Sequence, residues 1–288
     1  MDTAKTRRKN VWLNELDDLI RGACGGFLFG IPLLYTMEVW WIGSVVEPPL
    51  MLLAIAITYI VIFLLNRTAG FRKIEKIGAI DAARNSVEAI SIGIVCATAM
   101  LILLRELSFS VPLDEVLGKV LFESLPFTLG VALANQFLSG DRGGNEGQSS
   151  HKRQSEINAT FSDIGATLIG ATVIALNIAP TDEVVMLASA LSGGRLLAII
   201  AASLIISYGI VFQSGFSDQQ KRIQQQGIFQ RPMSETLACY LVSLAAAAFM
   251  LWFFHQLSFD NPWTMWLQYT LILGLPATIG GAAGRLTV

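Results

Sequence analysis

Glu123 is the side chain of this sequence best placed to bind a cation or carry a proton. It stands inside an apolar run, in the segment LFESLP at 121–126. A carboxyl group at membrane depth is costly unless it is paired, protonated or hydrated. Pro126 removes a backbone donor and frees the carbonyl of Phe122, next to Glu123. A cation or proton site and a purely structural pairing of the carboxyl both fit this pattern.

Glu38 and Glu183 form a second set of candidates, in the similar segments TMEV at 36–39 and TDEV at 181–184. Each glutamate follows an apolar run and precedes a short apolar segment. Thr36 and Thr181 could cap these segments, with the glutamate in the first helical turn, which explains the spacing by itself. The functional alternative brings the two carboxylates face to face, where they would attract a cation or share a proton.

Pro32, Pro126 and Pro276 lie inside apolar runs. Proline often bends a membrane helix only for packing, and the alternative is a hinge or an unwound binding segment. Glycines spaced four residues apart, at 22, 26 and 30 and again at 280 and 284, predict closely packed helices.

Other chemistries lack the residues that they need. The chain has two histidines, and its three cysteines all lie in apolar runs, so neither a metal site nor a disulfide framework is indicated. Nucleotide-binding, metalloprotease and esterase motifs are missing from the sequence. We therefore expect no cofactor, no metal and no enzymatic activity. The net charge of −2 argues against a nucleic-acid partner.

Composition places these residues in a membrane. Hydrophobic residues make up 53% of the 288 residues and charged residues only 15%, too few to cover a soluble domain. Eight apolar stretches approach the length of a membrane span, and none alternates as a barrel strand would. They run over 22–42, 49–65, 87–104, 118–138, 164–179, 196–212, 236–254 and 263–283. The sequence thus predicts an all-α polytopic membrane helix bundle that contacts the lipid bilayer.

The basic residues predict the orientation of this bundle. With eight spans, only Arg105, Lys119 and Arg195 of the 20 basic residues fall on one side. By the positive-inside rule, the other side is cytoplasmic and holds both termini, in a bacterial inner (plasma) membrane. For the two outer arginines we expect ion pairs with nearby acids such as Glu106 or Glu183.

The two halves of the chain resemble each other. The tripeptide LSF at 107–109 recurs 150 residues later, and Pro126, Thr128 and Gly130 have identical counterparts at the same offset. In the first spans, Gly25 and Gly30 are matched with Gly165 and Gly170. We expect two four-helix repeats with the same orientation, at 1–138 and 161–288, joined by a cytoplasmic linker at 139–160. The counterpart of Glu123 is Leu273, so a site there is asymmetric.

The glycine-rich first span, the TMEV segment and the doubled L-S-F-x-x-P and L-P-x-T-x-G elements carry a resemblance. With these features the sequence resembles an uncharacterised family of bacterial multi-pass integral membrane proteins, a domain of unknown function. The resemblance covers most of the chain. It implies a multi-pass membrane protein and brings no activity, ligand or catalytic residue.

The leading hypothesis for function is a secondary transporter or channel-like protein for a small cation or a proton-coupled solute. Glu123, Glu38 and Glu183 supply the negative field in this hypothesis, and Pro126 and Pro276 supply bending. The alternative is a non-transporting membrane scaffold or signalling partner. A polar cavity between the halves that contains Glu123 favours transport, and a dry, tightly packed centre favours the scaffold.

Overall fold

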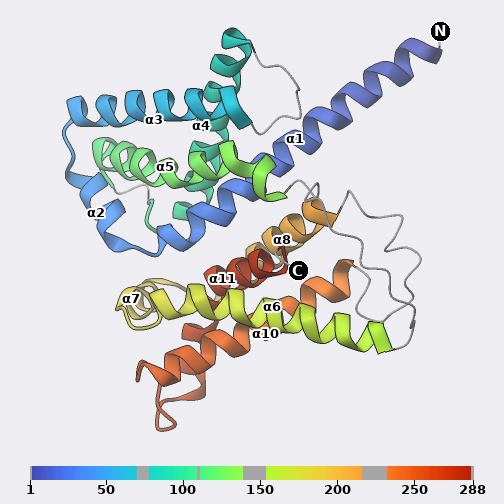
Figure 1. The fold of residues 1–288 in the computed structure, drawn as a ribbon. Coiled ribbons are helices and arrows are strands. Elements are labelled where there is room, and N and C mark those ends of the chain that lie inside the picture. The colour runs from blue at the N-terminus through green and yellow to red at the C-terminus, as the bar shows by residue number, and fades with distance from the viewer. Residues whose placement is uncertain (1, 70–77, 109–110, 139–153, 216–231, 287–288) are drawn as a thin grey trace.

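The computed structural model describes residues 2–69, 78–108, 111–138, 154–215 and 232–286, in part as backbone alone. This part of the chain contains ten α-helices and no strand, which confirms the all-α prediction (Figure 1). The first half contains α1 (Asp2–Leu34), α2 (Met37–Val45), α3 (Pro48–Ala69), α4 (Ala79–Leu103) and α5 (Leu113–Leu138). The second contains α6 (Gln154–Ile178), α7 (Glu183–Ala190), α8 (Gly193–Gly215), α10 (Pro232–Phe253) and α11 (Trp263–Arg285).

Among the described helices, five are long and apolar enough to cross a membrane: α3, α4, α5, α8 and α10. Two more spans are reached if each of two bent helix pairs counts as one. The structure thus supports five to seven membrane spans. An eighth span would have to be α11, which is not among these helices, so the expected eight spans stay a prediction.

One bent pair divides a predicted span. The sequence predicts one span over 22–42, and in the structure α1 ends at Leu34 and α2 continues at an angle of 86°, so a single span over this run is a bent one. Thr36 between them has extended backbone, with φ −102° and ψ 98°, which breaks the helical hydrogen-bond ladder. In the second half, α6 and α7 meet at 85°. The short helices α2 and α7 lie on the same side of the molecule, at the left in Figure 1, and we call this the α2–α7 end.

The helices α4 and α10 end in the same way. Arg105 and His255, 150 residues apart, have positive φ of 68° and 62°. Beyond them, the amides of Glu106 and Leu107 donate to the carbonyl of Leu101, and the amides of Gln256 and Leu257 donate to that of Leu251. This left-handed cap usually uses glycine, because side chains make the conformation costly. Arg105 and His255 thus adopt the same left-handed conformation at positions 150 residues apart.

Glycines let the long helices pack closely, as their spacing predicted. A Cβ atom added to Gly25 of α1 would lie 2.5 Å from the carbonyl oxygen of Gly130 on α5. A Cβ added to Gly280 of α11 would lie 2.5 Å from the carbonyl oxygen of Gly170 on α6. In the second half it is Gly170 that makes this kind of contact, whereas Gly165 has open space around it. The match of Gly25 with Gly165 in two repeats stays a prediction.

The helices differ sharply in what surrounds them. α3 exposes most of its apolar side chains, including Leu52, Ile57 and Ile60, as a helix that faces lipid does. By contrast, every residue of α11 from Leu271 to Ala282 is buried. α11 packs against α6, α8 and α10 and forms the core of the second half.

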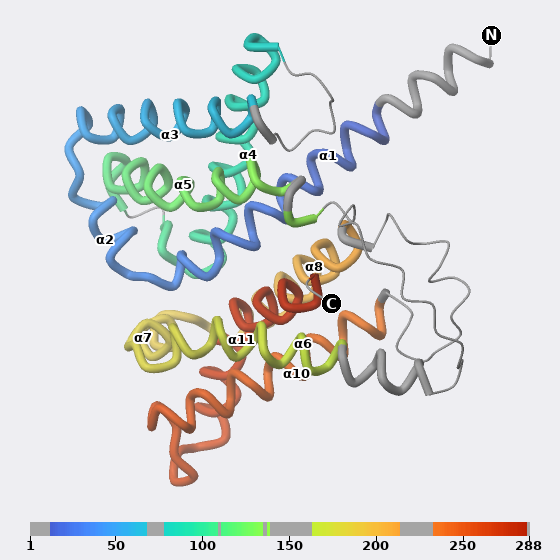
Figure 2. Tube along the Cα trace, in the orientation of Figure 1, coloured from blue at the N-terminus to red at the C-terminus, as the bar shows by residue number. Residues whose placement is uncertain are grey.

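The two halves lie side by side as separate groups of helices, which the trace in Figure 2 makes visible. Contacts between them come mainly from α1, which packs against α8 and α11. The Tyr35 hydroxyl at the end of α1 donates to the carbonyl of Ile272 on α11, at 2.8 Å. Pro276 frees this same carbonyl, because proline has no amide to donate to the residue four positions earlier. The proline-induced defect in α11 is therefore repaired by the other half.

Candidate functional site

Glu123 lies at the middle of the apolar span Leu113–Ala134 of α5. Its side chain is fully buried, and neither carboxyl oxygen has a hydrogen-bond partner. An ionised carboxylate in such surroundings costs several kcal/mol. The site as it stands therefore favours the protonated, neutral carboxyl group. The structural pairing that we considered as an alternative is not formed within the described residues.

A charged cluster lies one turn from Glu123, toward the α2–α7 end. The Lys119 ammonium contacts the Glu115 carboxylate at 2.9 Å and lies 3.8 Å from a carboxylate oxygen of Glu106. It also sits 5.8 Å from the ring centre of Trp40 on α2, a cation–π distance. The Lys119 side chain is only 11% exposed. We name Glu106, Glu115 and Lys119 the α5 charge cluster.

The protonation of Glu106 is also shifted by its surroundings. Burial raises the pKa of Glu106 above its usual value, although the nearby Lys119 lowers it; Glu115 adds to the increase. Glu106 therefore holds a proton more readily than an exposed glutamate does. Sequence reasoning missed the α5 charge cluster, although the spacing of 115, 119 and 123 by four residues was a legible signal.

The structure places Glu38 and Glu183 in different environments. Both lie in the first turn of a short helix, as predicted: Glu38 in α2, which packs on α5, and Glu183 in α7, which packs on α11. Glu38 is exposed, whereas Glu183 is buried and one of its carboxyl oxygens has no partner. The two glutamates are thus not equivalent.

The expected threonine caps are wrong. Thr36 precedes α2 without a capping hydrogen bond from its side chain. The residue before α7 is Asp182, and the Thr181 hydroxyl donates instead to the carbonyl of Ile178 in the preceding helix. Pro32, Pro126 and Pro276 lie within α1, α5 and α11, as predicted.

Arg105 and Arg195 join the two halves at the α2–α7 end. Arg105, after α4, donates to the carbonyl of Ala190 at the end of α7, at 2.8 Å. Arg195, in α8, donates to the carbonyl of Ile102 at the end of α4, at 2.6 Å. The expected ion pairs with Glu106 or Glu183 are therefore replaced by contacts to helix C-termini, whose partial negative charge attracts a cation. We call this pair the arginine clasp.

Replacing Arg105 or Arg195 with glutamine is expected to lower the free energy of unfolding by about 1 kcal/mol each, since one charged hydrogen bond is lost each time. Thermal unfolding in detergent measures this loss. Arg67→Gln, at the last turn of α3, is the control and should cost less than about 0.5 kcal/mol. If all three variants lose the same free energy of unfolding, the two hydrogen bonds of the arginine clasp add nothing to the effect of removing a positive charge.

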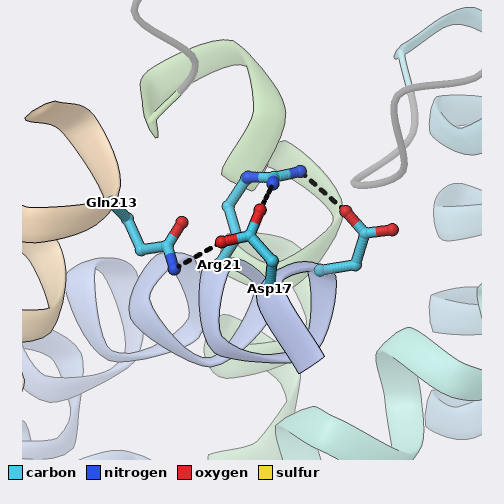
Figure 3. Close-up of polar contacts among 4 residues, drawn as sticks. Asp17, Arg21 and Gln213 are labelled. Carbon is cyan, nitrogen blue, oxygen red and sulfur yellow. Dashed lines mark hydrogen bonds and ion pairs between the residues drawn. The ribbon is translucent and has the colours of Figure 1, made fainter. Parts of the chain in front are cut away.

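A polar contact also joins the halves at the opposite end. Arg21 of α1 pairs with Asp17 and with Asp18, the latter at 2.8 Å. Asp17 in turn accepts a hydrogen bond from the Gln213 side chain of α8, at 3.2 Å, as Figure 3 shows. Together with the arginine clasp, this contact ties the halves at both ends of the molecule.

A small cavity of about 20 Å³, the size of one water molecule, lies in the second half. Asp163, Glu235, Cys239 and Arg285 are among its lining residues. Arg285 pairs with Glu235 and, at 3.2 Å, with Asp163. Sequence reasoning missed these ion pairs. In the described part of the chain, no group of three or more His, Cys, Asp or Glu side chains could hold a metal ion.

Comparisons with known proteins agree with a membrane protein. The search of curated proteins and the search of solved structures gave no match. The family model described as "Putative integral membrane protein (DUF2391)" matches residues 18–288. This confirms the resemblance to an integral membrane family, while the expected bacterial origin stays a prediction. The apolar helices of this chain make it a multi-pass protein, and with nearly its whole length matched it belongs to the DUF2391 family of integral membrane proteins.

Proposed function

We propose that this protein is a secondary transporter or channel-like protein for a small cation or a proton-coupled solute, with Glu123 as its ion-binding carboxyl group. One observation carries the proposal: the Glu123 side chain is fully buried in mid-span and has no partner for either oxygen. Acidic side chains inside membrane spans are rare, and they commonly mark ion pathways and proton relays.

The contrast between the halves supports a functional role for Glu123. Its counterpart Leu273, 150 residues later, is fully buried in α11. In both helices one residue follows and then the pair Leu-Pro, at 125–126 and at 275–276. Since the second half packs an apolar side chain at this place, the helix pairing does not need a carboxyl group there. A role in ion binding therefore explains the carboxyl group better than a role in packing does.

The proposed architecture is eight spans in two four-helix repeats of equal orientation, with the α2–α7 end outside and both termini in the cytoplasm of a bacterial cell. The bends of 86° and 85°, the matched caps at Arg105 and His255 and the two glycine pairs support the repeats. Counting α11 and the two bent pairs as spans gives the even number that this orientation requires.

Replacing Glu123 with glutamine tests the proposed function. Glutamine keeps the shape of the side chain but neither ionises nor carries a proton. We expect the flux of protons or monovalent cations into proteoliposomes to fall at least about 100-fold, as loss of an essential acid–base group does. Asp114→Asn, at an exposed carboxylate in the first turn of α5, is the control and separates a general loss of negative charge from loss of the buried site. Unchanged flux in the Glu123 variant, or none from the wild type, contradicts the proposal.

A second candidate function is a non-transporting scaffold or signalling partner. The close glycine contacts in each half and the contacts that tie the halves together at both ends favour it, because they make a rigid bundle. Absence of flux from the wild type, together with a stoichiometric protein partner that copurifies in mild detergent, would select this function over transport.

A further inference from the structure

Lys119 stands between two carboxylates on one face of α5. Glu115, Lys119 and Glu123 are spaced four residues apart, so each side chain neighbours the next along the helix. In the structure the ammonium group of Lys119 has turned toward Glu115, at 2.9 Å. Glu123, one turn away on the other side, has no partner. The flexible four-carbon stem of lysine lets one ammonium group reach either neighbour.

We propose that Lys119 is the switch of a proton-binding site at Glu123: its ammonium group pairs with Glu115 and Glu106 while Glu123 is protonated, and pairs with Glu123 when that proton has left. This inference rests on the proposed function only in taking Glu123 as the ion-binding group. Proton release breaks the O–H bond of the carboxyl group and passes the proton to water as hydronium. The carboxylate that remains is then neutralised by the Lys119 ammonium group.

The charges around the site fit this exchange. Glu106 lies 3.8 Å from the Lys119 ammonium group, so it competes with Glu123 for the same cation. The α2 helix brings Trp40 against the ammonium group and carries Glu38, which is exposed. Arg195 of α8 is engaged by α4 carbonyls in the arginine clasp. The other charged side chains described on α1, α3 and α4 lie toward the opposite end: Glu15, Asp17, Asp18, Arg21, Arg67, Asp81, Arg84 and Glu88. Lys119 is therefore the cation best placed to balance an ionised Glu123.

The second half shows that α5 does not need these charges to pack. At the same offset of 150 residues, Glu106, Glu115, Lys119 and Glu123 are replaced by the neutral residues Gln256, Met265, Tyr269 and Leu273. The second half, which lacks the buried carboxyl group, thus also lacks the three charges of the α5 charge cluster. We expect this pattern if the α5 charge cluster controls the charge of Glu123.

Carbodiimide labelling of the full-length protein in liposomes tests the switch. A hydrophobic carbodiimide reacts with protonated carboxyl groups in apolar surroundings, and mass spectrometry of the Glu123 peptide gives the extent of labelling at each pH. Lys119→Met removes the cation that stabilises ionised Glu123, so the midpoint of labelling should move to higher pH by about one unit or more. Glu115→Gln frees the ammonium group for Glu123, so the midpoint should move to lower pH.

Two controls separate the switch from a general charge effect. Lys119→Arg keeps a cation at the same place, and Asp114→Asn removes an exposed acid beside the α5 charge cluster, so both should keep the wild-type midpoint. If Lys119→Met does not fold, Lys119→Tyr copies the residue that the second half uses and should give the same upward shift.

The switch is overturned if Glu123 is labelled at no pH, if the Lys119 and Glu115 variants keep the wild-type midpoint, or if both move it in the same direction. Labelling needs no transport. A wild-type protein that conducts nothing but shows the two opposite shifts would refute the proposed function and support the switch.

Discussion

Replacing Gly280 with alanine is expected to lower the free energy of unfolding by about 2–3 kcal/mol, because a methyl group forced into a closely packed contact separates the helices. The added Cβ would lie 2.5 Å from the carbonyl oxygen of Gly170 and equally close to Ile174. A backbone carbonyl cannot rotate away as a flexible side chain does, so α11 and α6 must move apart. Thermal or denaturant unfolding in detergent measures the loss.

Gly165→Ala, on the same helix as Gly170, is the matched control for this prediction. Nothing lies within 4 Å of a Cβ added at Gly165, and alanine is favoured over glycine inside helices by about 0.5–1 kcal/mol. We therefore expect Gly165→Ala to stabilise the protein slightly. If both variants lose stability equally, the close approach of α6 and α11 is not what holds the second half together.

Replacing Glu123 with leucine is expected to stabilise the folded protein by about 1–3 kcal/mol, the cost of a buried polar group without a partner, while abolishing ion flux. The side chain that the second half carries at Leu273 removes this cost without a change in helix packing. Opposite changes in stability and activity are typical of residues kept for function. Unfolding and flux are measured on the same preparation.

Asp114→Asn again serves as the control for this pair of measurements. Asp114 lies in the first turn of α5, where a negative charge is favourable by about 0.3–1 kcal/mol, so its loss should destabilise slightly. If Glu123→Leu instead lowers stability by more than about 1 kcal/mol, the carboxyl group has a structural partner in the membrane, and its role is to hold the bundle together.

Features that depend on side-chain size and polarity could be predicted from the sequence. The apolar runs predicted the long helices, because length and hydropathy decide which segments cross a bilayer. The four-residue spacing of Gly280 and Gly284 predicted a close helix contact, and both face α6. By contrast, the bend after Leu34 falls within a continuous apolar run, and only the possible helix start at Thr36 and Glu38 pointed to a break there. Hydropathy reports how apolar a segment is and does not show where the axis of a helix changes direction.

Contacts to the backbone of distant segments could not be predicted. Arg105 and Arg195 each bind a carbonyl oxygen, 85 and 93 residues away in sequence, and a carbonyl has no signature in the amino-acid type. The sequence places Lys119 on the outer side, at the start of the apolar run 118–138, whereas α5 begins five residues earlier, at Leu113. Its spacing from Glu115 and Glu123 was available, and it would have shown that Lys119 shares a helix face with both.

The complete burial of α11 from Leu271 to Ala282 has a consequence for biosynthesis. Ribosomes make this segment after α6, α8 and α10, the helices that enclose it. The insertion machinery selects segments by their affinity for lipid, and α11 meets protein along most of its length. Docking of α11 into the bundle therefore depends on neighbours that have already been inserted, and a truncated chain that ends before α11 would leave their inner faces open to quality-control proteases.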